Sequence, residues 1–479
     1  MDKQVAEKKI YYSEKLASEQ DIQVDTIGSY ASWLNLLEKH QLNIKRQWLP
    51  DTTVLTNELV EENIEDAVNT WKNLPPGSRC SWALFTEYIL PYKIAKEYPE
   101  RWRQKARKRF DTVARAIPAD DHFAIGLLDT INSNLQQWFR FNVHHSPATW
   151  AELVAFKNGD CVAVSTLMAF AGRAYGLPVA IDYCPVWANI NGRNHYWNAL
   201  LQTGKKALPF MGGESNPGTY NPFLLFETLL PEGDKSTYKK CAKVFRHTFS
   251  VNQKSIHQWI QNDLDIPYTL SDDHCIDVTK EYFPVHDIAV PVSAQAPQKI
   301  AYLCVYNSGQ WVPTAWDTVT GHQQAVFTNM ATEQLYMPAF FSAGVVTPIQ
   351  APFIADSSGC GYLVPATSNR ITMKIKWLAS VEQEQLDLYS HVTEMPWKDF
   401  AVKQHLLAAG KNRTEVQNGK RYSLYYWDKD WILLTTVTGV KGWTEFKRVP
   451  ANCLYKVAAV GSAGNERVFT YRNGKQRWW

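Results

Sequence analysis

The segment from residue 147 to residue 215 limits the possible folds most, because it sets one helix directly before three short strands. Small and apolar residues over 162–175 predict a helix, which Gly176-Leu177-Pro178 ends. Strands are predicted over residues 179–187, 195–201 and 206–211. The order helix, strand, strand, strand indicates an α+β domain.

The residues before this segment predict helices. Residues 27–40 place apolar side chains near helical spacing, and aromatic residues over 82–92 do the same. Pro75-Pro76-Gly77 breaks the pattern between them. We therefore expect residues 1–140 to form an N-terminal helical region packed on a core over residues 141–240.

Short alternating strands rich in aromatic residues dominate after about residue 240. Such strands are typical of β-sandwich domains. At roughly 150 residues per domain, a chain of 479 residues has room for about three domains. We expect one β-rich, sandwich-like domain over 241–378 and a second β-rich domain over 379–479.

The composition excludes several classes of protein. With 50 Lys plus Arg against 47 Asp plus Glu, the net charge is only +3, so no nucleic-acid partner is expected. No stretch of about 18 apolar residues predicts a transmembrane segment. None of the eight cysteines forms a CxxC pair, and His144-His145 has no further ligand spacing, so neither a metal nor a cofactor is expected.

Cys161 and His195 are the residues that point to chemistry. Cys161 follows Gly159-Asp160 at the start of the predicted helix, where the helix dipole favours a thiolate. We therefore expect Cys161 to be the most reactive of the eight thiols. His195 begins the second predicted strand and could pair with the thiolate and protonate a leaving amine.

The pattern from Gly159-Asp160-Cys161 through Gly176-Leu177-Pro178-Val179 to His195-Tyr196-Trp197-Asn198 resembles the transglutaminase-like superfamily. That resemblance implies a papain-like core with a Cys, His and Asp triad. Residues 85–92, 209–214 and 277–282, and the closing residues 466–470 and 478–479, resemble a Bacteroides-type branch of large exported proteins. In that branch β-rich domains follow the core.

The third residue of the triad departs from the family pattern. No Asp follows His195 until Asp234, and the nearest carboxylate is Glu214. If the hairpin turn lies between Thr203 and Gly204, Glu214 becomes a diagonal neighbour of His195 on the next strand. Asn198 is the alternative, because papain-like enzymes use Asn, but on the same strand it points to the opposite face. We therefore prefer Glu214.

Three further residues are candidates for the cleft. Trp187 and Trp197 flank the site in sequence and are either core residues or cleft walls. Glu87, on the aromatic helical stripe, either buttresses the site or is a structural carboxylate. Asn198 completes the set of possible substrate contacts.

The expected function is a thiol enzyme acting on amide bonds, a protease or amidase in preference to a cross-linking acyl transferase. Its substrate would be a peptide, a protein or a peptidoglycan-type amide. The alternative is a non-catalytic cell-envelope binding protein, whose core is a scaffold and whose aromatic β-domains bind a glycan or a protein. By resemblance the chain is exported, to the periplasm, the outer membrane as a lipoprotein or the cell surface, with its leader removed; a cytoplasmic location stays open.

Overall fold

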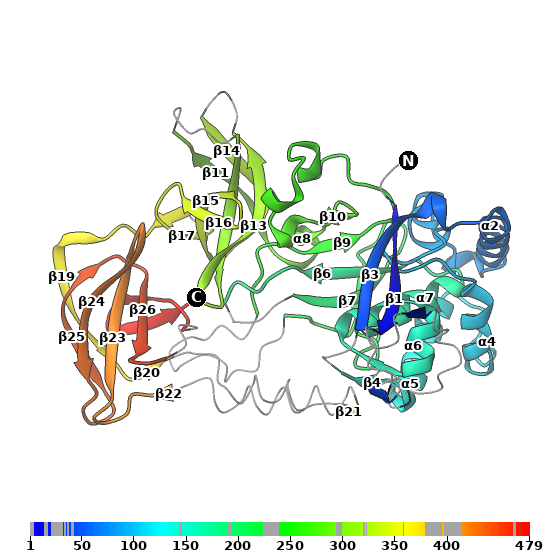
Figure 1. The fold of residues 1–479 in the computed structure, drawn as a ribbon, viewed down its shortest axis with the longest axis horizontal. Helices are drawn as coiled ribbons and strands as arrows, with labels where there is room; N and C mark the ends of the chain where they lie inside the picture. The colour runs from blue at the N-terminus through cyan, green and yellow to red at the C-terminus, as the bar shows by residue number, and fades with distance from the viewer. Residues whose placement is uncertain are drawn as a thin grey trace.

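The structure is a computed structural model (Figure 1). It describes residues 4–13, 18–20, 32, 35, 38–39, 43–142, 146–189, 194–223, 239–293, 299–319, 321, 323–357, 359–378, 395–396, 414–462 and 466–479. Helices gather at one end of the molecule, a sheet lies beside them, and β-rich parts continue to the other end (Figure 1). No described helix is both long and apolar enough to span a lipid bilayer.

The core is an antiparallel five-stranded sheet covered by helix α7 (Cys161–Ala174). In spatial order its strands are β10 (Cys275–Asp277), β9 (Phe245–His247), β6 (Val179–Cys184), β7 (His195–Leu200) and β8 (Leu208–Phe210). The predicted order of one helix and three strands is confirmed.

Strands β9 and β10 extend the core sheet beyond the boundary expected at residue 240. The guanidinium of Arg246 on β9 donates two hydrogen bonds, of 2.7 and 2.8 Å, to the buried carboxylate of Asp182 on β6. This ion pair joins two strands that are neighbours in the sheet but far apart in sequence. The core therefore runs to about residue 282, where the short helix α8 (Thr279–Tyr282) ends.

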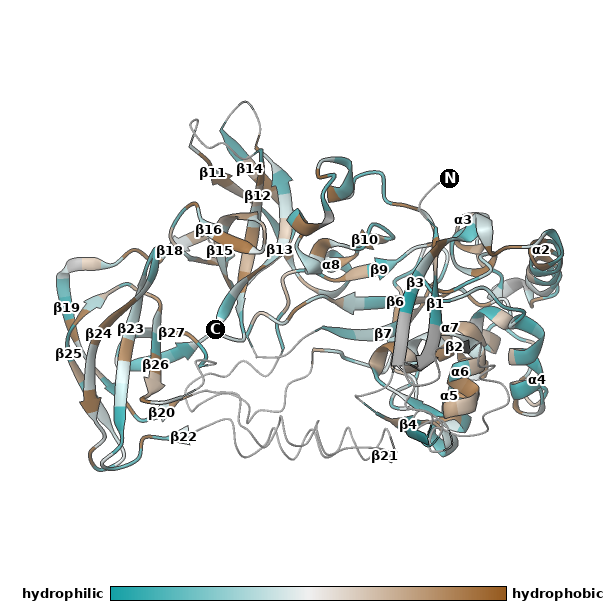
Figure 2. Ribbon diagram, in the orientation of Figure 1, coloured by the Kyte–Doolittle hydropathy of each residue, from teal (hydrophilic) through white to brown (hydrophobic). Residues whose placement is uncertain are grey.

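Helix α7 packs closely on the sheet because its residues are small. A Cβ atom on Gly172 would lie 2.4 Å from Cγ2 of Val179 on β6, so only glycine fits there. Helices α4 (Arg103–Ala114), α5 (Phe123–Trp138) and α6 (Trp150–Phe156) contact the rest of α7. The outer helix α4 is mainly hydrophilic, whereas α5 is more hydrophobic (Figure 2).

The N-terminal region contains a sheet as well as helices, which corrects the expectation of helices alone. Strand β1 (Val5–Ser13) pairs with β2 (Ser18–Gln20) and with β3 (Asn43–Pro50). Helices α2 (Asn57–Lys72) and α3 (Trp82–Leu84) and a π-helical turn, Phe85–Ile89, follow. Within the helix predicted over 27–40, residues 32, 35, 38 and 39 are described and are helical, and the others lie outside the described residues.

The remaining short elements connect these parts. Strands β4 (Arg140–Phe141), β5 (Asn158–Gly159) and β21 (Met395–Pro396) form a small sheet. Short 3-10 helices span Asp51–Thr53, Pro76–Ser78, Ile256–Gln258, Asp263–Asp265 and Tyr268–Leu270.

The middle β-rich part has a six-stranded sheet, and the strand β12 (Ile300–Asn307) within it is buried on both faces. The other strands of the sheet are β13 (Gln310–Thr318), β15 (Gln334–Ser342), β16 (Val345–Pro348), β17 (Phe353–Asp356) and β18 (Gly359–Tyr362). Ala301, Leu303 and Val305, which alternate along β12, pack toward the second sheet, β11 (Val285–Pro291) and β14 (Gln324–Ala331). Tyr302 and Tyr306 pack on the opposite face, where they share a core with Trp427 and Trp479.

The C-terminal β domain contains two antiparallel sheets that share one core. Strands β19 (Ala366–Ile375) and β25 (Thr444–Ala451) face the sheet formed by β23 (Arg421–Asp428), β24 (Asp430–Thr438), β26 (Tyr455–Ala459), β27 (Phe469–Arg472) and β28 (Lys475–Trp478). The short strands β20 (Trp377–Leu378) and β22 (Thr414–Glu415) pair beside it. Because β19 pairs with β25, this domain begins before the expected boundary at residue 378.

Candidate functional site

Cys161 begins helix α7, as the sequence predicted. Asp160 caps this helix, because its Oδ1 accepts a hydrogen bond of 3.0 Å from the backbone N–H of Ala163. Ser146 Oγ donates a second hydrogen bond of 3.0 Å to the same carboxylate oxygen. The thiol is half-buried against the core formed by α7 and the sheet.

The surroundings of the Cys161 thiol favour its neutral form. Burial raises the pKa of Cys161 to about 12, and the negative charge of Asp160 acts in the same direction. The backbone N–H groups of Tyr196 and Val162 lower this pKa but do not offset burial. Burial therefore opposes the thiolate that the helix start predicted, and the thiolate stays a prediction.

His195 begins strand β7, and its imidazole lies among aromatic rings. The ring centre is 6.1 Å from that of Trp187 and 5.7 Å from that of Trp197. Its Nε2 lies 2.7 Å from the hydroxyl of Tyr220. Burial lowers the pKa of His195 to about 3, and the positive charge of Lys239 adds to this effect. The imidazole is therefore neutral at pH 7.

Cys161 and His195 belong to two elements that meet at one place. The thiol lies beside the backbone N–H of Tyr196, the residue directly after His195. Among the described residues, no hydrogen bond joins the thiol to the imidazole, whose Nε2 is bonded to Tyr220. The structure thus places the Cys161 thiol beside the start of the strand that carries His195, without a formed ion pair.

Glu214 lies in the turn after β8, where its backbone N–H donates a hydrogen bond of 3.0 Å to the carbonyl of Met211. Burial raises the pKa of the Glu214 carboxyl, and the charge of Lys239 opposes this rise. Within the described part of the chain, no hydrogen bond joins this carboxyl to His195. The role of Glu214 as the third residue therefore stays a prediction.

Tyr220 is the observed partner of His195, and sequence reasoning missed it. Burial raises its pKa well above the ordinary value, so the phenol keeps its proton. A turn brings it back, because the backbone N–H of Gly218 donates a hydrogen bond of 2.8 Å to the carbonyl of Pro209. The turn signal Asn216-Pro217-Gly218 directly before Tyr220 was the local hint.

Lys239 brings a positive charge to the site, and no sequence pattern identified it. Its Nζ lies 5.2 Å from the centre of the Trp187 ring. Burial lowers the pKa of Lys239, while the charge of Glu214 acts to raise it. These groups therefore share one electrostatic environment.

Asn198 and Glu87 make contacts away from His195. Asn198 lies on the opposite face of β7, as expected, and its Nδ2 donates a hydrogen bond of 2.8 Å to the carbonyl of Ser165 on α7. The Glu87 carboxylate accepts hydrogen bonds of 2.9 and 2.7 Å from the backbone N–H and the Oγ of Ser250. The first contact joins β7 to α7, and the second joins the π-helical turn to the segment after β9.

Trp187 and Trp197 are buried around His195. Trp197 is 0% exposed, and its Nε1 donates a hydrogen bond of 2.9 Å to the hydroxyl of Tyr282. That hydroxyl donates one of 2.6 Å to Asp182, the partner of Arg246. Trp197 therefore links the imidazole to the buried ion pair of the sheet.

An imidazole–carboxylate pair lies elsewhere beside the same sheet, and sequence reasoning missed it too. His247 Nδ1 is 2.9 Å from Asp272 Oδ2. The His247 ring stacks on Tyr183 at 4.8 Å, and Tyr183 stacks on Tyr196 at 5.0 Å. This aromatic layer reaches the residue whose backbone lies beside the Cys161 thiol.

The described residues contain no group of three His, Cys, Asp or Glu side chains placed to hold a metal ion. His144 and His145, the residues considered for a metal, lie outside the described residues.

Comparison of the sequence with known protein families and with curated proteins gives no match. Nine chains of solved structures match. One is the periplasmic domain of TgpA from Pseudomonas aeruginosa bound to ethylmercury, with 20% identity over 24% of this chain and 45% of that chain, at a TM-score of 0.20. Another is red sea bream transglutaminase, with 9% identity over 90% of this chain and 76% of that chain, at a TM-score of 0.21. Neither score is high enough to bear on the chemistry of this chain.

Proposed function

We propose that the chain is a thiol enzyme that transfers acyl groups from amide bonds, with a transglutaminase-like core. The observation that carries this proposal is the placement of Cys161 at the start of α7, with its thiol beside the backbone N–H that follows His195. A nucleophile at a helix start next to a strand that carries a base is the arrangement such chemistry requires.

In the first step His195 acts as a general base. Neutral imidazole takes the Sγ proton while Sγ attacks the carbonyl carbon of the amide, and the backbone N–H of Cys161 helps to hold the developing oxyanion. The imidazolium then gives its proton to the leaving nitrogen, the C–N bond breaks, and an amine and a thioester remain. Catalytic hydrogen bonds often tighten only when substrate is bound, so the absence of a Cys161–His195 bond at rest is compatible with this step.

In the second step water is the acceptor. His195 takes a proton from water as its oxygen attacks the thioester carbon, and Cys161 Sγ leaves with the returned proton. The products are a carboxylic acid and the free thiol. An amine in place of water would give a new amide, which is the cross-linking outcome.

Tyr220 positions His195 in this proposal. In this role the oxygen of its hydroxyl accepts a hydrogen bond from Nε2–H, which leaves the lone pair of Nδ1 to take the proton of the thiol. Glu214 and Lys239 supply charge behind this pair, and Glu214 is the residue that could accept a hydrogen bond if the imidazole becomes charged.

Measurement of the products formed from protein substrates tests the proposal. Casein peptides incubated with the enzyme should gain free α-amino groups if water is the acceptor, or release ammonia and gain cross-links if lysine is. Cys161→Ala should abolish either product, whereas Cys360→Ala should not. Equal product with Cys161→Ala would overturn the proposal.

A second function is favoured by one observation, the neutral state of both side chains. A thiol with a pKa of about 12 and an imidazole with a pKa of about 3 also suit a core that only supports a binding protein. Under this alternative no substrate class yields a product that depends on Cys161. A location in the cell envelope is likewise a proposal, and fractionation of the source cells tests it.

A further inference from the structure

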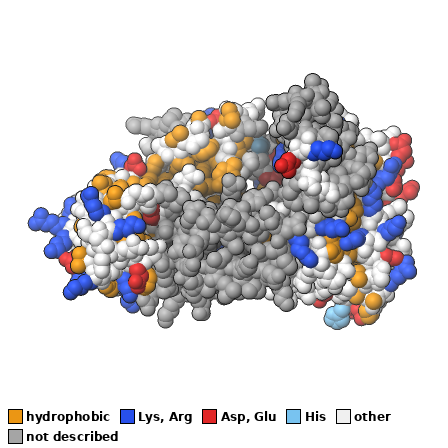
Figure 3. Space-filling model, turned by 60° about the horizontal axis from the view of Figure 1, so that its bottom comes forward, with side chains coloured by type: hydrophobic (Ala, Val, Ile, Leu, Met, Phe, Trp, Pro, Cys, Tyr) orange, Lys and Arg blue, Asp and Glu red, His pale blue; other side chains and the backbone are white. Residues whose placement is uncertain are grey.

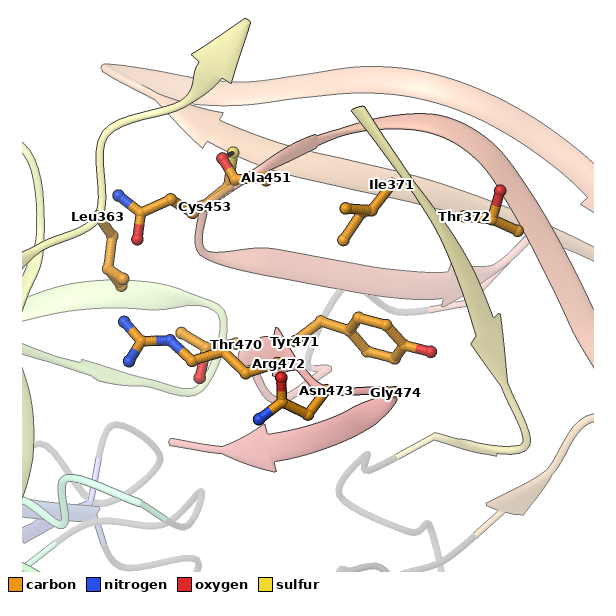
Figure 4. A pocket seen from close by; sticks show the side chains of 11 residues that line it. Leu363, Ile371, Thr372, Ala451, Cys453, Thr470, Tyr471, Arg472, Asn473 and Gly474 are labelled. Carbon is orange, nitrogen blue, oxygen red and sulfur yellow. Dashed lines mark hydrogen bonds between the residues drawn. The ribbon is translucent and has the colours of Figure 1, made fainter. Parts of the chain in front are cut away.

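The C-terminal β domain has a cavity between its two sheets, far from the thiol. Strand β19 and the turn that follows β25 form one side of it, and the β27–β28 hairpin forms the other (Figure 4). Its volume is about 430 Å³, within the range of small-molecule sites. Helix α7 and this domain lie at opposite ends of the molecule (Figure 1).

The cavity has a mixed apolar and polar lining with a single kind of charge. Arg472 is its only ionisable lining residue besides Tyr471 and the buried Cys453, and no carboxylate lines it. The guanidinium forms no ion pair or hydrogen bond with any described side chain. In Figure 4 Arg472 reaches toward the end marked by Leu363, while the phenol of Tyr471 reaches toward Thr372.

The surrounding domain is strongly basic. Residues 366–378 and 414–479 contain 14 Lys or Arg and five Asp or Glu, a net charge of +9, although the whole chain carries only +3. Figure 3 shows Lys and Arg side chains gathered at this end of the molecule. Such a field attracts anions and raises their concentration near the cavity.

The cavity does not suit an added peptide strand. The backbone N–H of Lys374 on β19 already donates a hydrogen bond of 3.2 Å to the hydroxyl of Tyr471. The register of β19 against β25 also shifts between Ile371 and Met373, which bends the strand beside the cavity. Regular pairing of a peptide along this edge would therefore be interrupted.

We propose that this cavity binds an acidic sugar of a polysaccharide. The Arg472 guanidinium matches a sugar carboxylate in charge and fork geometry. The Asn452 side chain uses its Nδ2 to donate to the carbonyls of Tyr362 and Val364, at 3.2 and 3.3 Å, which leaves its Oδ1 for a sugar hydroxyl. Asn473 and Thr372 offer further polar groups, and Tyr471 and Ile371 offer apolar surface to the ring.

Titration calorimetry of the full chain with tetragalacturonate tests the proposal. We expect binding to the wild type, at least a tenfold loss with Arg472→Gln, and an equal loss when the wild type meets the fully methyl-esterified tetramer. Lys420→Gln is the matched control, because it removes one exposed cation of the same domain outside the cavity. It should bind as the wild type does.

Several outcomes would overturn the proposal. These are no binding of the acid, equal binding of its methyl ester, equal losses with both variants, or equally tight binding of tetraglutamate, which has the charge without the sugar. Cys161→Ala should bind tetragalacturonate normally. The sugar-binding proposal and the proposed acyl transfer can therefore be refuted independently of each other.

Discussion

At the scale of single residues, burial determines the chemistry of the site. Burial favours the neutral forms of both Cys161 and His195, because the charged form of each would lack the hydration that it has in water. Under the proposed function, the thiol would therefore depend on proton transfer to the imidazole during reaction. Burial thus acts against the resting thiolate that the helix start predicted.

Asp160 allows the capping and electrostatic effects at Cys161 to be separated. Asp160→Asn keeps an oxygen that can cap α7 and removes the charge that raises the pKa of Cys161. We expect faster alkylation of Cys161 by iodoacetamide at pH 8, measured by mass spectrometry of the labelled peptide. Asp160→Ala removes the same charge and the cap as well, so it should also lower stability by about 1 kcal/mol.

The exposed Cys360 is the internal control for this measurement. In the wild type it should react before Cys161, because its thiol is accessible. An unchanged Cys161 rate in Asp160→Asn would show that the Asp160 charge does not govern the thiol.

The lowered pKa of His195 predicts acid sensitivity. The unfolded chain binds a proton near pH 6.5 and the folded chain only near pH 3. Between these values the unfolded state holds more protons, so this group lowers stability as the pH falls, by up to ~1.4 kcal/mol per pH unit. Urea unfolding of His195→Gln from pH 7 to pH 4 should show a shallower decline than the wild type. Parallel declines would mean that the imidazole can be protonated in the folded state.

At the scale of elements, the sequence predicted the helices and strands whose formation depends on residues close together in the chain. The succession of α7, β6, β7 and β8 follows from helix and hairpin signals close together in the chain. Strands β1 and β3 were missed, because each is stabilised by a partner distant in sequence. Tyr220 was missed for the same reason, since only the folded turn brings it to His195.

The close packing of α7 on β6 predicts a specific weakness. Gly172→Ala would force its Cβ against Val179 and Leu128, at 2.4 and 3.3 Å from their nearest atoms, and should cost about 1–3 kcal/mol. Gly126→Ala on α5 is the control, because its nearest contact is 3.4 Å from Ile117. That change should be neutral or stabilising by up to ~1 kcal/mol. Urea unfolding of both variants measures the difference, and equal effects would contradict the packing argument.

At the scale of the whole molecule, buried contacts join the C-terminal β domain to the rest. Arg467 is buried and donates hydrogen bonds of 2.9 Å to the carbonyls of Tyr306 on β12 and of Ala188 after β6. Trp479 packs in the core that contains Tyr302. A fragment ending at residue 275 would cut β10 and expose this joint, so we expect it to be poorly soluble.

Arg467→Gln should loosen this joint. It removes two hydrogen bonds from a charged donor, worth about 1.5–3 kcal/mol each. We expect a lower melting temperature and faster cleavage by trypsin between the domains. The exposed Arg448→Gln is the control and should melt as the wild type does. Unchanged proteolysis of Arg467→Gln would mean that the apolar contacts alone hold the domains together.

The pH dependence of Cys161 acylation tests the central claim most directly. With p-nitrophenyl acetate as donor, the acetyl thioester on the Cys161 peptide is quantified between pH 5 and pH 9. A neutral imidazole with a pKa of about 3 and a thiol with a pKa of about 12 predict a rate that stays nearly constant over this range. In His195→Gln only the thiolate reacts, so the rate should fall at pH 7 and rise about tenfold per pH unit. The same steep rise in both proteins would contradict the account, because His195 would then take no part in activating Cys161.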